Sequence, residues 1–540
     1  MSNMEIIINS DKRFDEEYPK IIKQVNKKKL EQYEPTKDEM LKVYNIIINY
    51  IKDKKRKMYG GYTLNILLKD KDPKLAIYDE DDMPDVDFYS TEPLIDLKDL
   101  CDKLHKEGFK GVVGQEAQHP ESYKIFVNQH EYCDITYMPS NIYHKVKFLK
   151  INDLILIHPW FMMIDYFRMF TDPIGSYFRL DKTYVRYMKL QKAYPLPLIK
   201  KPLIIENYEN KTLDRVIDLL EEFMTSRNDV LTTGFYMYNY YLHKSNYNKE
   251  DNKYNYIKPP YLEYYSTNFI NDGLAILDFI KNLPQETNKY LIHKEAVPFF
   301  QFLGHSLIIY FKDGKDEIPI LYLFNNFKKC IPFKEVNYIK FNGKTPEEKK
   351  NKISVAGFDQ NILHSLIMLV KFRIDDESEM WNDLLYRYIN GIVLFKKYYF
   401  SNNKKDEFDD TVFQSFITNC RGFMITQERE KRMRMEERKK QGKPLVFRYE
   451  PANNSKFDPS KVFFSNSSGN VIRKENLYKI IEKNKDKNID YDKLENDDKE
   501  QDNKSEEVKE ENKEKEEKEK EKKEKSLKEL KETESFYDEL

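Results

Sequence analysis

Three aspartates have the spacing expected of a metal-binding carboxylate cluster. Asp85 and Asp87 are two residues apart in a short run that alternates polar and apolar residues, which predicts a β-strand. Successive side chains on a strand point to opposite faces, so both carboxylates share one face and the apolar residues point to the interior. Asp134 lies in a second predicted strand, residues 130–138. If these strands are neighbours, the three carboxylates converge.

Such a cluster suits phosphoryl transfer with divalent cations. Mg²⁺ and Mn²⁺ prefer oxygen ligands, and Mg²⁺ keeps part of its coordination sphere for water and substrate phosphates. Two ions about 3.5–4 Å apart can activate an attacking hydroxyl and stabilise a leaving pyrophosphate. We expect Asp134 to serve mainly the ion near the attacking 3′-hydroxyl, and Asp85 and Asp87 to serve both ions.

A glycine pair supplies a candidate site for a triphosphate. Gly60 and Gly61 precede residues 63–68, whose leucines lie at helical spacing. Two residues without Cβ let the backbone come close to an anion at a helix N-terminus. A glycine pair alone is more often a plain turn, and a lone Asp-x-Asp is more often a solvated loop. The ordered combination of both motifs with Asp134 favours the functional interpretation.

Four cations follow the aspartate strands at intervals of three and four residues. Arg179, Lys182, Arg186 and Lys189 therefore share one face of a predicted helix, residues 178–193. Contact with the triphosphate or with the phosphates of a primer is one interpretation. A solvated helix face is the other, and the pattern does not separate them.

The elements that must position these residues follow a regular order. Residues 38–54 predict an amphipathic helix, and residues 93–107 predict another between the two aspartate strands. The remaining predicted elements are a hairpin within 108–126, helices at 160–170 and 178–193, and paired strands at 306–311 and 318–324. The order predicts a mixed α/β (α+β) fold.

Composition limits the kind of protein. At 540 residues the chain exceeds one ordinary core, and its net charge of -1 gives no overall attraction to nucleic acid. Much of the acid lies near the C-terminus, which leaves the region before it more basic. We expect an extension at 1–37, a catalytic domain at 38–198, a second domain at 199–470 and a charged tail at 471–540.

The cysteines and apolar segments argue against zinc and against a membrane. Cys101, Cys133, Cys330 and Cys420 are scattered without CxxC spacing, so we expect four buried free thiols. No apolar stretch approaches the roughly 18 residues that a membrane span requires, and the N-terminus lacks the pattern of a signal peptide. These features favour a reducing, cytosolic setting.

The motifs between Tyr59 and Tyr137 resemble those of the polymerase β-like nucleotidyltransferase superfamily. Beyond them the chain resembles the poly(A) polymerase catalytic subunits of large nucleocytoplasmic DNA viruses, the giant-virus members more closely than the poxvirus ones. The resemblance implies that Gly60 and Gly61 contact ATP, and that Asp85, Asp87 and Asp134 bind two Mg²⁺ or Mn²⁺ ions.

The resemblance also implies a second, degenerate nucleotidyltransferase-like domain. Residues 304–306 are a candidate for its eroded glycine turn, and residues 320–324 for its metal strand. Implied partners are ATP and the 3′ end of mRNA, together with either a second copy of the chain or a separate viral processivity subunit. The implied setting is the virus factory in the host cytoplasm, or the virion.

Two rival functions stay open. A uridylyl- or CCA-adding enzyme would share the motifs, because they specify the chemistry and not the base. A silent RNA-binding scaffold is disfavoured, since a retired site has no reason to keep three converging carboxylates.

Three further segments favour structural roles. The basic residues of 429–443 alternate with glutamates, which favours a solvated helix over an RNA contact. The tyrosines of 236–241 favour core packing over base stacking. His158 precedes a proline and favours a structural corner over a catalytic imidazole.

Overall fold

The structure is a computed structural model of the chain. It describes residues 12–32, 35–199, 201–205, 210–296, 298–326, 329–342, 345–374, 379–422, 427–440, 442, 447–453 and 472–473. The chain divides into two units, Met1–Arg473 and Lys474–Leu540. The predicted charged tail, 471–540, lies outside the described residues apart from 472–473. The other predicted domain boundaries stay predictions.

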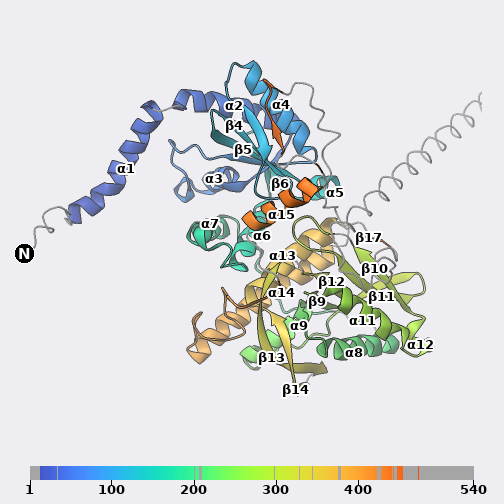
Figure 1. Cartoon of the computed structure of the whole chain (residues 1–540). Coiled ribbons are helices and arrows are strands. Elements are labelled where there is room, and N and C mark those ends of the chain that lie inside the picture. Colours follow the sequence, from blue (N-terminus) through green and yellow to red (C-terminus); the bar gives the residue numbers. More distant parts are fainter. Residues whose placement is uncertain are drawn as a thin grey trace, which may run out of the picture. The chain divides into compact units, whose positions relative to one another are not determined.

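An eight-stranded mixed sheet contains Asp87 and Asp134 (Figure 1, blue to cyan). Its strand order is β16-β3-β4-β5-β2-β1-β7-β6. The strands are β1 (Lys57–Tyr59), β2 (Val86–Ser90), β3 (Val113–Glu116), β4 (Ser122–Val127), β5 (His130–Tyr137), β6 (Phe148–Ile151), β7 (Leu154–Ile157) and β16 (Arg448–Tyr449). Seven of them come from one continuous region, whereas β16 returns from far along the chain to pair with β3.

The helices around this sheet confirm the predicted ones. The first, α2 (Lys37–Lys54), begins after Thr36, whose hydroxyl accepts a hydrogen bond from the amide of Glu39, and ends at Lys55, whose φ is 53°. Its apolar stripe is buried, as its helical spacing requires. The others are α3 (Gly60–Lys71), α4 (Pro93–Lys106), α5 (Ser140–Lys145), α6 (Pro159–Phe170) and α7 (Leu180–Ala193), with 3₁₀ helices η1 (Pro73–Leu75) and η2 (Tyr177–Arg179).

A nine-stranded mixed sheet forms the second half (Figure 1, green to yellow). Its order is β15-β13-β14-β8-β9-β12-β11-β10-β17. The strands are β8 (Val230–Thr233), β9 (Leu262–Ser266), β10 (Leu291–Ala296), β11 (Ser306–Asp313), β12 (Asp316–Asn325), β13 (Cys330–Asn342), β14 (Thr345–Ala356), β15 (Cys420–Gly422) and β17 (Ile472–Arg473). The predicted pair at 306–311 and 318–324 is β11 and β12, and the predicted mixed α/β class is confirmed.

The remaining helices belong to this half or to the ends of the described chain. They are α1 (Lys12–Gln32), α8 (Lys211–Thr225), α9 (Phe235–Ser245), α10 (Tyr247–Glu250), α11 (Phe269–Lys281), α12 (Gln285–Asn288), α13 (Phe358–Ile374), α14 (Glu379–Asn403) and α15 (Gln427–Lys440). Among the described helices, none has the length and apolarity needed to span a bilayer.

The second sheet repeats the topology of the first. Strands β3, β4, β5, β2, β1, β7 and β6 correspond in order to β10, β11, β12, β9, β8, β14 and β13, with the same parallel and antiparallel pairings. In each half a glycine with positive φ follows the strand that comes first in the chain, β1 or β8, and precedes the next helix. Gly60 begins α3, and Gly234 is the N-cap of α9. The chain therefore contains two copies of one topology, as the resemblance implied.

The second copy has lost the aspartates. Glu263 on β9 lies opposite Thr233, which is the register position that Asp87 has opposite Tyr59. On β12, Tyr322 is paired with Glu263 in the position that corresponds to Asp134. A metal cluster of the first kind is therefore not repeated at these positions.

This register corrects one expectation. The glycine turn of the second half is Gly234, so the assignment of residues 304–306 was wrong. Residues 320–324 belong to β12, which corresponds to β5 and not to β2, the strand of Asp87. Gly304 instead precedes β11 and lies against the backbone of Asn325. Without an Asp-x-Asp motif on β9, the sequence offered no marker for the true turn.

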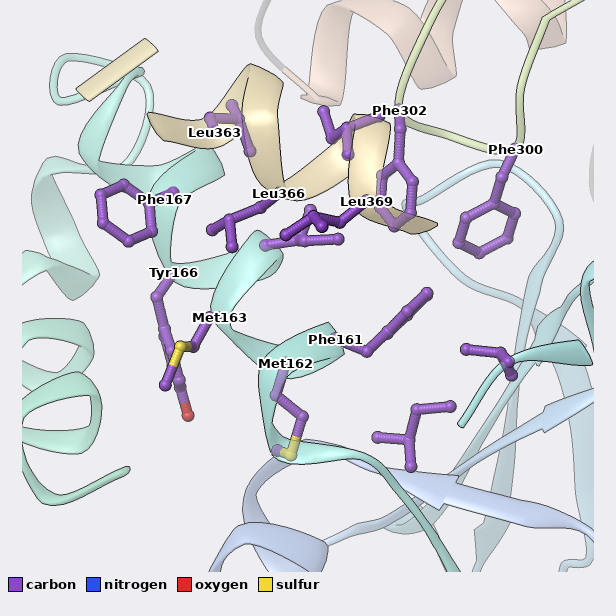
Figure 2. Packing of buried hydrophobic residues seen from close by; sticks show 14 of the residues in the cluster. Phe161, Met162, Met163, Tyr166, Phe167, Phe300, Phe302, Leu363, Leu366 and Leu369 are labelled. Atoms are coloured by element: carbon purple, nitrogen blue, oxygen red, sulfur yellow. The ribbon is translucent and has the colours of Figure 1, made fainter. Parts of the chain in front are cut away.

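Helices α6 and α13 pack against each other beside the first sheet (Figure 2). Phe161 of α6 lies 5.5 Å from Phe302 between ring centroids, and Tyr89 of β2 lies 6.1 Å from Phe300. Figure 2 shows Phe161 and Phe302 on the side of α13 that carries Leu366 and Leu369. The second half is thereby fixed against the elements that carry the aspartates.

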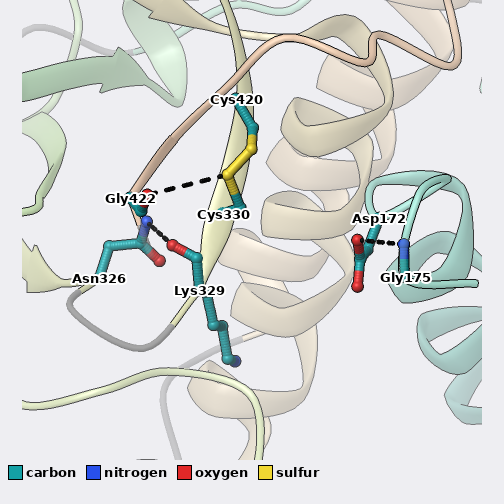
Figure 3. The surroundings of a disulfide bond; sticks show 7 residues. All are labelled: Asp172, Gly175, Asn326, Lys329, Cys330, Cys420 and Gly422. Atoms are coloured by element: carbon teal, nitrogen blue, oxygen red, sulfur yellow. Dashed lines mark hydrogen bonds between the residues drawn. A yellow bond between two sulfur atoms is a disulfide. The ribbon is translucent and has the colours of Figure 1, made fainter. Parts of the chain in front are cut away.

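A disulfide joins Cys330 of β13 to Cys420 of β15 (Figure 3). The two strands are antiparallel, and their register places Cys330 opposite Gly422 and Pro332 opposite Cys420. This corrects the expectation of four free thiols, whereas Cys101 and Cys133 are free and buried as predicted. The pair is 90 residues apart in sequence, so its spacing carried no local signal.

Candidate active site

The three aspartates converge at one edge of the first sheet. Strands β2 and β5 are parallel neighbours, and their register places Asp87 directly beside Asp134. Asp85 immediately precedes β2, and one carboxylate oxygen from each residue lies within 4.8 Å of the others. All three are partly buried. The sequence-predicted cluster is thus brought together by strand register.

The electrostatics of the cluster favour a divalent cation. Burial raises the pKa of Asp87 well above its usual value, and the charges of Asp85 and Asp134 raise it further. Burial also raises the pKa of Asp134 to about 7, although Lys124 opposes this shift. Clustered carboxylates repel one another until a cation compensates them. Hard oxygen donors in this number fit Mg²⁺ or Mn²⁺ with room for substrate phosphates.

Lys124 is a site residue that the sequence did not reveal. It lies on β4 opposite Asp134, and its ammonium is 3.2 Å from a carboxylate oxygen of Asp134 and also pairs with Glu131. The only available signal was the hairpin register, which places one lysine directly across from the third aspartate. Lys124 balances part of the negative charge of the cluster.

The glycine turn lies against the aspartates for a steric reason. Gly60 has a φ of +78°, and a β-carbon there would overlap the carboxylate of Asp87. A β-carbon on Gly61 would lie 2.5 Å from the hydroxyl of Tyr78 and 3.2 Å from the guanidinium of Arg186. The residues without side chains therefore allow the N-terminus of α3, the carboxylates and a cation of α7 to meet.

The four predicted cations do not all face the site. Arg179, Lys182 and Arg186 line the same cavity as the aspartates, and Arg186 donates a hydrogen bond of 2.5 Å to the hydroxyl of Tyr78. Burial, Arg186 and Arg179 lower the pKa of Lys182. Lys189 instead donates to the carbonyl of Ala76 at 2.6 Å and is not among the cavity-lining residues.

The cavity has a volume of about 750 Å³ and extends from the aspartates to the second half of the chain. The sequence did not identify any second-half residue as part of this cavity, although it had singled out Gly304 as a glycine turn, because these residues lie far along the chain. They include Phe300, Gln301, Phe302, Gly304, Asn325, Asn326, Lys329 and Gln360.

Among the described second-half residues that line the cavity, Lys329 is the charged one. Its ammonium donates to the carbonyls of Gln301 and Phe302 at 3.0 and 2.9 Å. Part of the side chain is exposed to solvent, and the protein atoms crowded around the ammonium, together with Arg168, lower its pKa. Lys329 therefore holds the turn of Phe300 and Phe302 against the cavity.

The tyrosine segment and His158 have the structural roles predicted for them, whereas α15 differs from the predicted solvated helix because its arginines contact the first half. The tyrosines from Tyr236 to Tyr241 on α9 are buried in the core. His158 caps α6, because its Nδ1 accepts a hydrogen bond from the amide of Trp160. On α15, Arg438 pairs with Glu116 and Arg434 donates to the carbonyl of Gln118, so part of its charge is occupied by protein.

Comparisons with known proteins agree with this geometry. Residues 45–176 match the family described as poly(A) polymerase catalytic subunit, and residues 188–482 match the C-terminal part of the corresponding APMV protein. A protein of Acanthamoeba polyphaga mimivirus that is named as a poly(A) polymerase catalytic subunit is 32% identical over 485 residues, covering 85% of this chain and 81% of its own. The chain belongs to the poly(A) polymerase catalytic subunit family.

A solved relative supports the fold of this poly(A) polymerase. The crystal structure of the Megavirus polyadenylate synthase superposes with a TM-score of 0.74 at 30% identity, covering 89% of this chain and 92% of that one. A similarly named protein of African swine fever virus is 30% identical over 173 residues, which is 31% of this chain and 35% of its own. The chain is therefore a nucleotidyltransferase of the poly(A) polymerase type and has viral relatives.

Proposed function

We propose that this poly(A) polymerase transfers AMP from ATP to the 3′ end of RNA without a template, using two divalent cations held by Asp85, Asp87 and Asp134. The parallel register that places Asp87 beside Asp134, directly against the Gly60 turn, carries the proposal. In the reaction, the RNA 3′-oxygen bonds to the α-phosphorus of ATP. The bond from that phosphorus to the bridging oxygen breaks, and pyrophosphate leaves with the electron pair.

The residues of the site have different roles in cation binding and positioning. Asp134 would serve mainly the cation near the attacking hydroxyl, and Asp85 and Asp87 would serve both cations. Bound cations would lower the pKa of the attacking hydroxyl and offset charge on the leaving pyrophosphate. Lys124 keeps Asp134 in place through their ion pair at 3.2 Å. The cations themselves are Mg²⁺ or Mn²⁺, and the ligand set does not distinguish between them.

The triphosphate is proposed to lie at the N-terminus of α3. Gly60 and Gly61 leave space there, and the helix dipole favours an anion. Lys182 and Arg186 supply positive charge from the same cavity. Lys189 donates a hydrogen bond to the Ala76 carbonyl, which favours a structural role over the predicted contact with ATP.

The base and the partners are finer points of the proposal. Family membership favours ATP over the UTP or CTP of a uridylyl- or CCA-adding enzyme, and the intact cluster disfavours a silent RNA-binding scaffold. We propose a homodimer as the working assembly in place of a separate processivity subunit. We also propose action in the host cytoplasm, at the virus factory, with packaging in the virion as a further option.

Primer extension tests the chemistry. A short oligoadenylate RNA is incubated with each NTP separately, with Mg²⁺, with Mn²⁺ or with a chelator, using wild type, Asp87→Asn and Asp134→Asn. Asp153→Asn is the matched control, because Asp153 is exposed in the β6–β7 turn, where asparagine tolerates its φ of 64°. We expect ATP-selective, metal-dependent extension that both cluster variants lose by at least about a hundredfold.

Other outcomes would change the proposal in different ways. Extension by Asp87→Asn at the wild-type rate would refute the metal assignment, and selective use of UTP or CTP would replace the substrate. Sedimentation as a monomer at micromolar concentration, with processive extension intact, would refute the homodimer.

A further inference from the structure

An exposed aromatic turn lies between α6 and α7. In η2, the side chains of Tyr177 and Phe178 are 75% and 63% exposed. Aromatic side chains of this size contribute most when they are buried, so two adjacent exposed rings are unusual. We call Tyr177 and Phe178, with the neighbouring Arg179, the aromatic turn.

The aromatic turn has a defined geometry. The rings of Tyr177 and Phe178 are 5.7 Å apart between centroids, with an interplanar angle of 80°. The guanidinium of Arg179 lies over the ring of Phe178 at 5.1 Å from its centroid. The two neighbours orient the Phe178 ring while most of its surface stays open. The arrangement offers a π-face with a cation beside it.

The aromatic turn is continuous with the catalytic cavity. Phe178 and Arg179 line the same cavity as Asp85, Asp87 and Asp134, and Lys182 follows on the next turn of the chain. Phe178 is nevertheless largely exposed to solvent, which places it at the rim and not at the floor. An RNA that is extended at its 3′ end must pass out of the cavity over such a rim, whereas ATP can be held within it.

Cations from several elements act on one residue of the cavity, His119. His119, in the β3–β4 hairpin, also lines the cavity, and its pKa is lowered to about 4 by burial and then by Arg168, Arg179, Lys124 and Arg434. These cations come from α6, η2, β4 and α15. The nearest acids on the same segment are Asp172, which accepts a hydrogen bond from the amide of Gly175, and Asp181. Arg168 is paired with Asp165 and Lys124 with Asp134, so the cations left to the turn itself are Arg179 and Lys182, which line the cavity beside Phe178.

From this combination, we propose that the aromatic turn is a stacking platform for unpaired bases of the RNA primer upstream of its reacting 3′ nucleotide. Aromatic rings with nearby cations bind single strands through stacking and phosphate contacts, and any base can stack. A duplex would keep its bases stacked inside, so the platform fits single-stranded RNA. The inference rests on the proposed function, because it assigns the RNA substrate a place at that site.

Binding without catalysis separates the two proposals. Fluorescence anisotropy of a labelled oligoadenylate RNA is measured without ATP for the wild type, for Tyr177→Ala/Phe178→Ala, and for Phe178→Leu and Phe178→Trp. Phe408→Ala is the control, since Phe408 is 96% exposed and lies outside the cavity. We expect the double variant to bind about tenfold more weakly. Phe178→Leu should also weaken RNA binding, because it removes the ring, whereas Phe178→Trp should keep the wild-type affinity.

Extension kinetics provide the second measurement. In the double variant, KM for the primer should rise about tenfold, while KM for ATP and kcat at saturating primer stay at the wild-type values. Equal RNA affinity in all variants would overturn the inference and leave the proposed function standing. A rise in KM for ATP alone would assign the turn to the nucleotide, and dissociation of a dimer with unchanged RNA affinity would assign it to a second copy. Either result would overturn the inference.

Discussion

Gly60 lies so close to Asp87 that a β-carbon on the glycine would overlap the aspartate carboxylate. In the second half, Gly234 has the same relationship to Glu263, which occupies the position of Asp87 in the repeated topology. Both glycines also have positive φ, at 78° and 67°. One steric arrangement is thus present twice, beside the aspartate cluster and at the corresponding position without it.

Substitution of the two glycines should separate folding from catalysis. Gly60→Ala and Gly234→Ala should each lower the free energy of unfolding by about 1–3 kcal/mol, because both combine a left-handed backbone with a steric clash. Only Gly60→Ala should also lower the extension rate per folded molecule, by about a hundredfold or more, since it displaces Asp87. Urea unfolding and primer extension measure the two effects. Normal extension by folded Gly60→Ala would contradict the predicted steric constraint.

Arg186 and Lys189 should differ although they share a helix. Arg186 lines the cavity, so Arg186→Gln should raise KM for ATP about tenfold or more. Lys189→Gln removes a hydrogen bond to the Ala76 carbonyl and should lower stability by about 1 kcal/mol while KM for ATP stays unchanged. Steady-state kinetics with saturating primer test the pair. An equal rise in KM for both variants would indicate that the whole helix face contacts the triphosphate.

His158 should make the protein sensitive to acid. Burial first, then Lys147 and Arg373, lower its pKa from 6.5 to about 4 in the folded state. Between these pH values the unfolded state binds more protons than the folded state. The contribution of His158 to the free energy of unfolding is therefore present above pH 6.5 and is lost as the pH falls toward 4. His158→Asn keeps an N-cap without a titrating group. Its urea midpoint should therefore fall less than that of the wild type between about pH 7 and about pH 5.

The disulfide should stabilise the second half. It joins residues 90 apart, and closing a loop of that length corresponds to about 4.6 kcal/mol in the chain-entropy account. Reductant should lower the Tm of the wild type to that of Cys330→Ser and should not change that of the variant. Thiol titration of the denatured, unreduced protein should detect the two free cysteines, Cys101 and Cys133. Detection of four free thiols would refute the bond.

The sequence predicted the catalytic half better than the second half for a physical reason. Asp87 and Asp134 alternate with buried apolar residues on β2 and β5, and Asp85 comes two residues before Asp87, so spacing alone indicated both strands and the shared face. Lys124 was missed because its role depends on which residue lies opposite it. Glu263 and Tyr322 were missed because one is a single acid and the other an ordinary strand residue. The disulfide depended on strand pairing across 90 residues.

The late strand β16 has a consequence for synthesis. Tyr449 is buried in the first half, where its hydroxyl donates a hydrogen bond of 2.6 Å to Asp102, and Arg448 pairs with Gln115 of β3. The catalytic sheet therefore keeps an open edge while the ribosome translates the whole second half, and an unpaired edge is prone to association with other strands. A premature stop codon shortly before Arg448 would spare the codons of Asp85, Asp87 and Asp134 and still leave this edge uncovered.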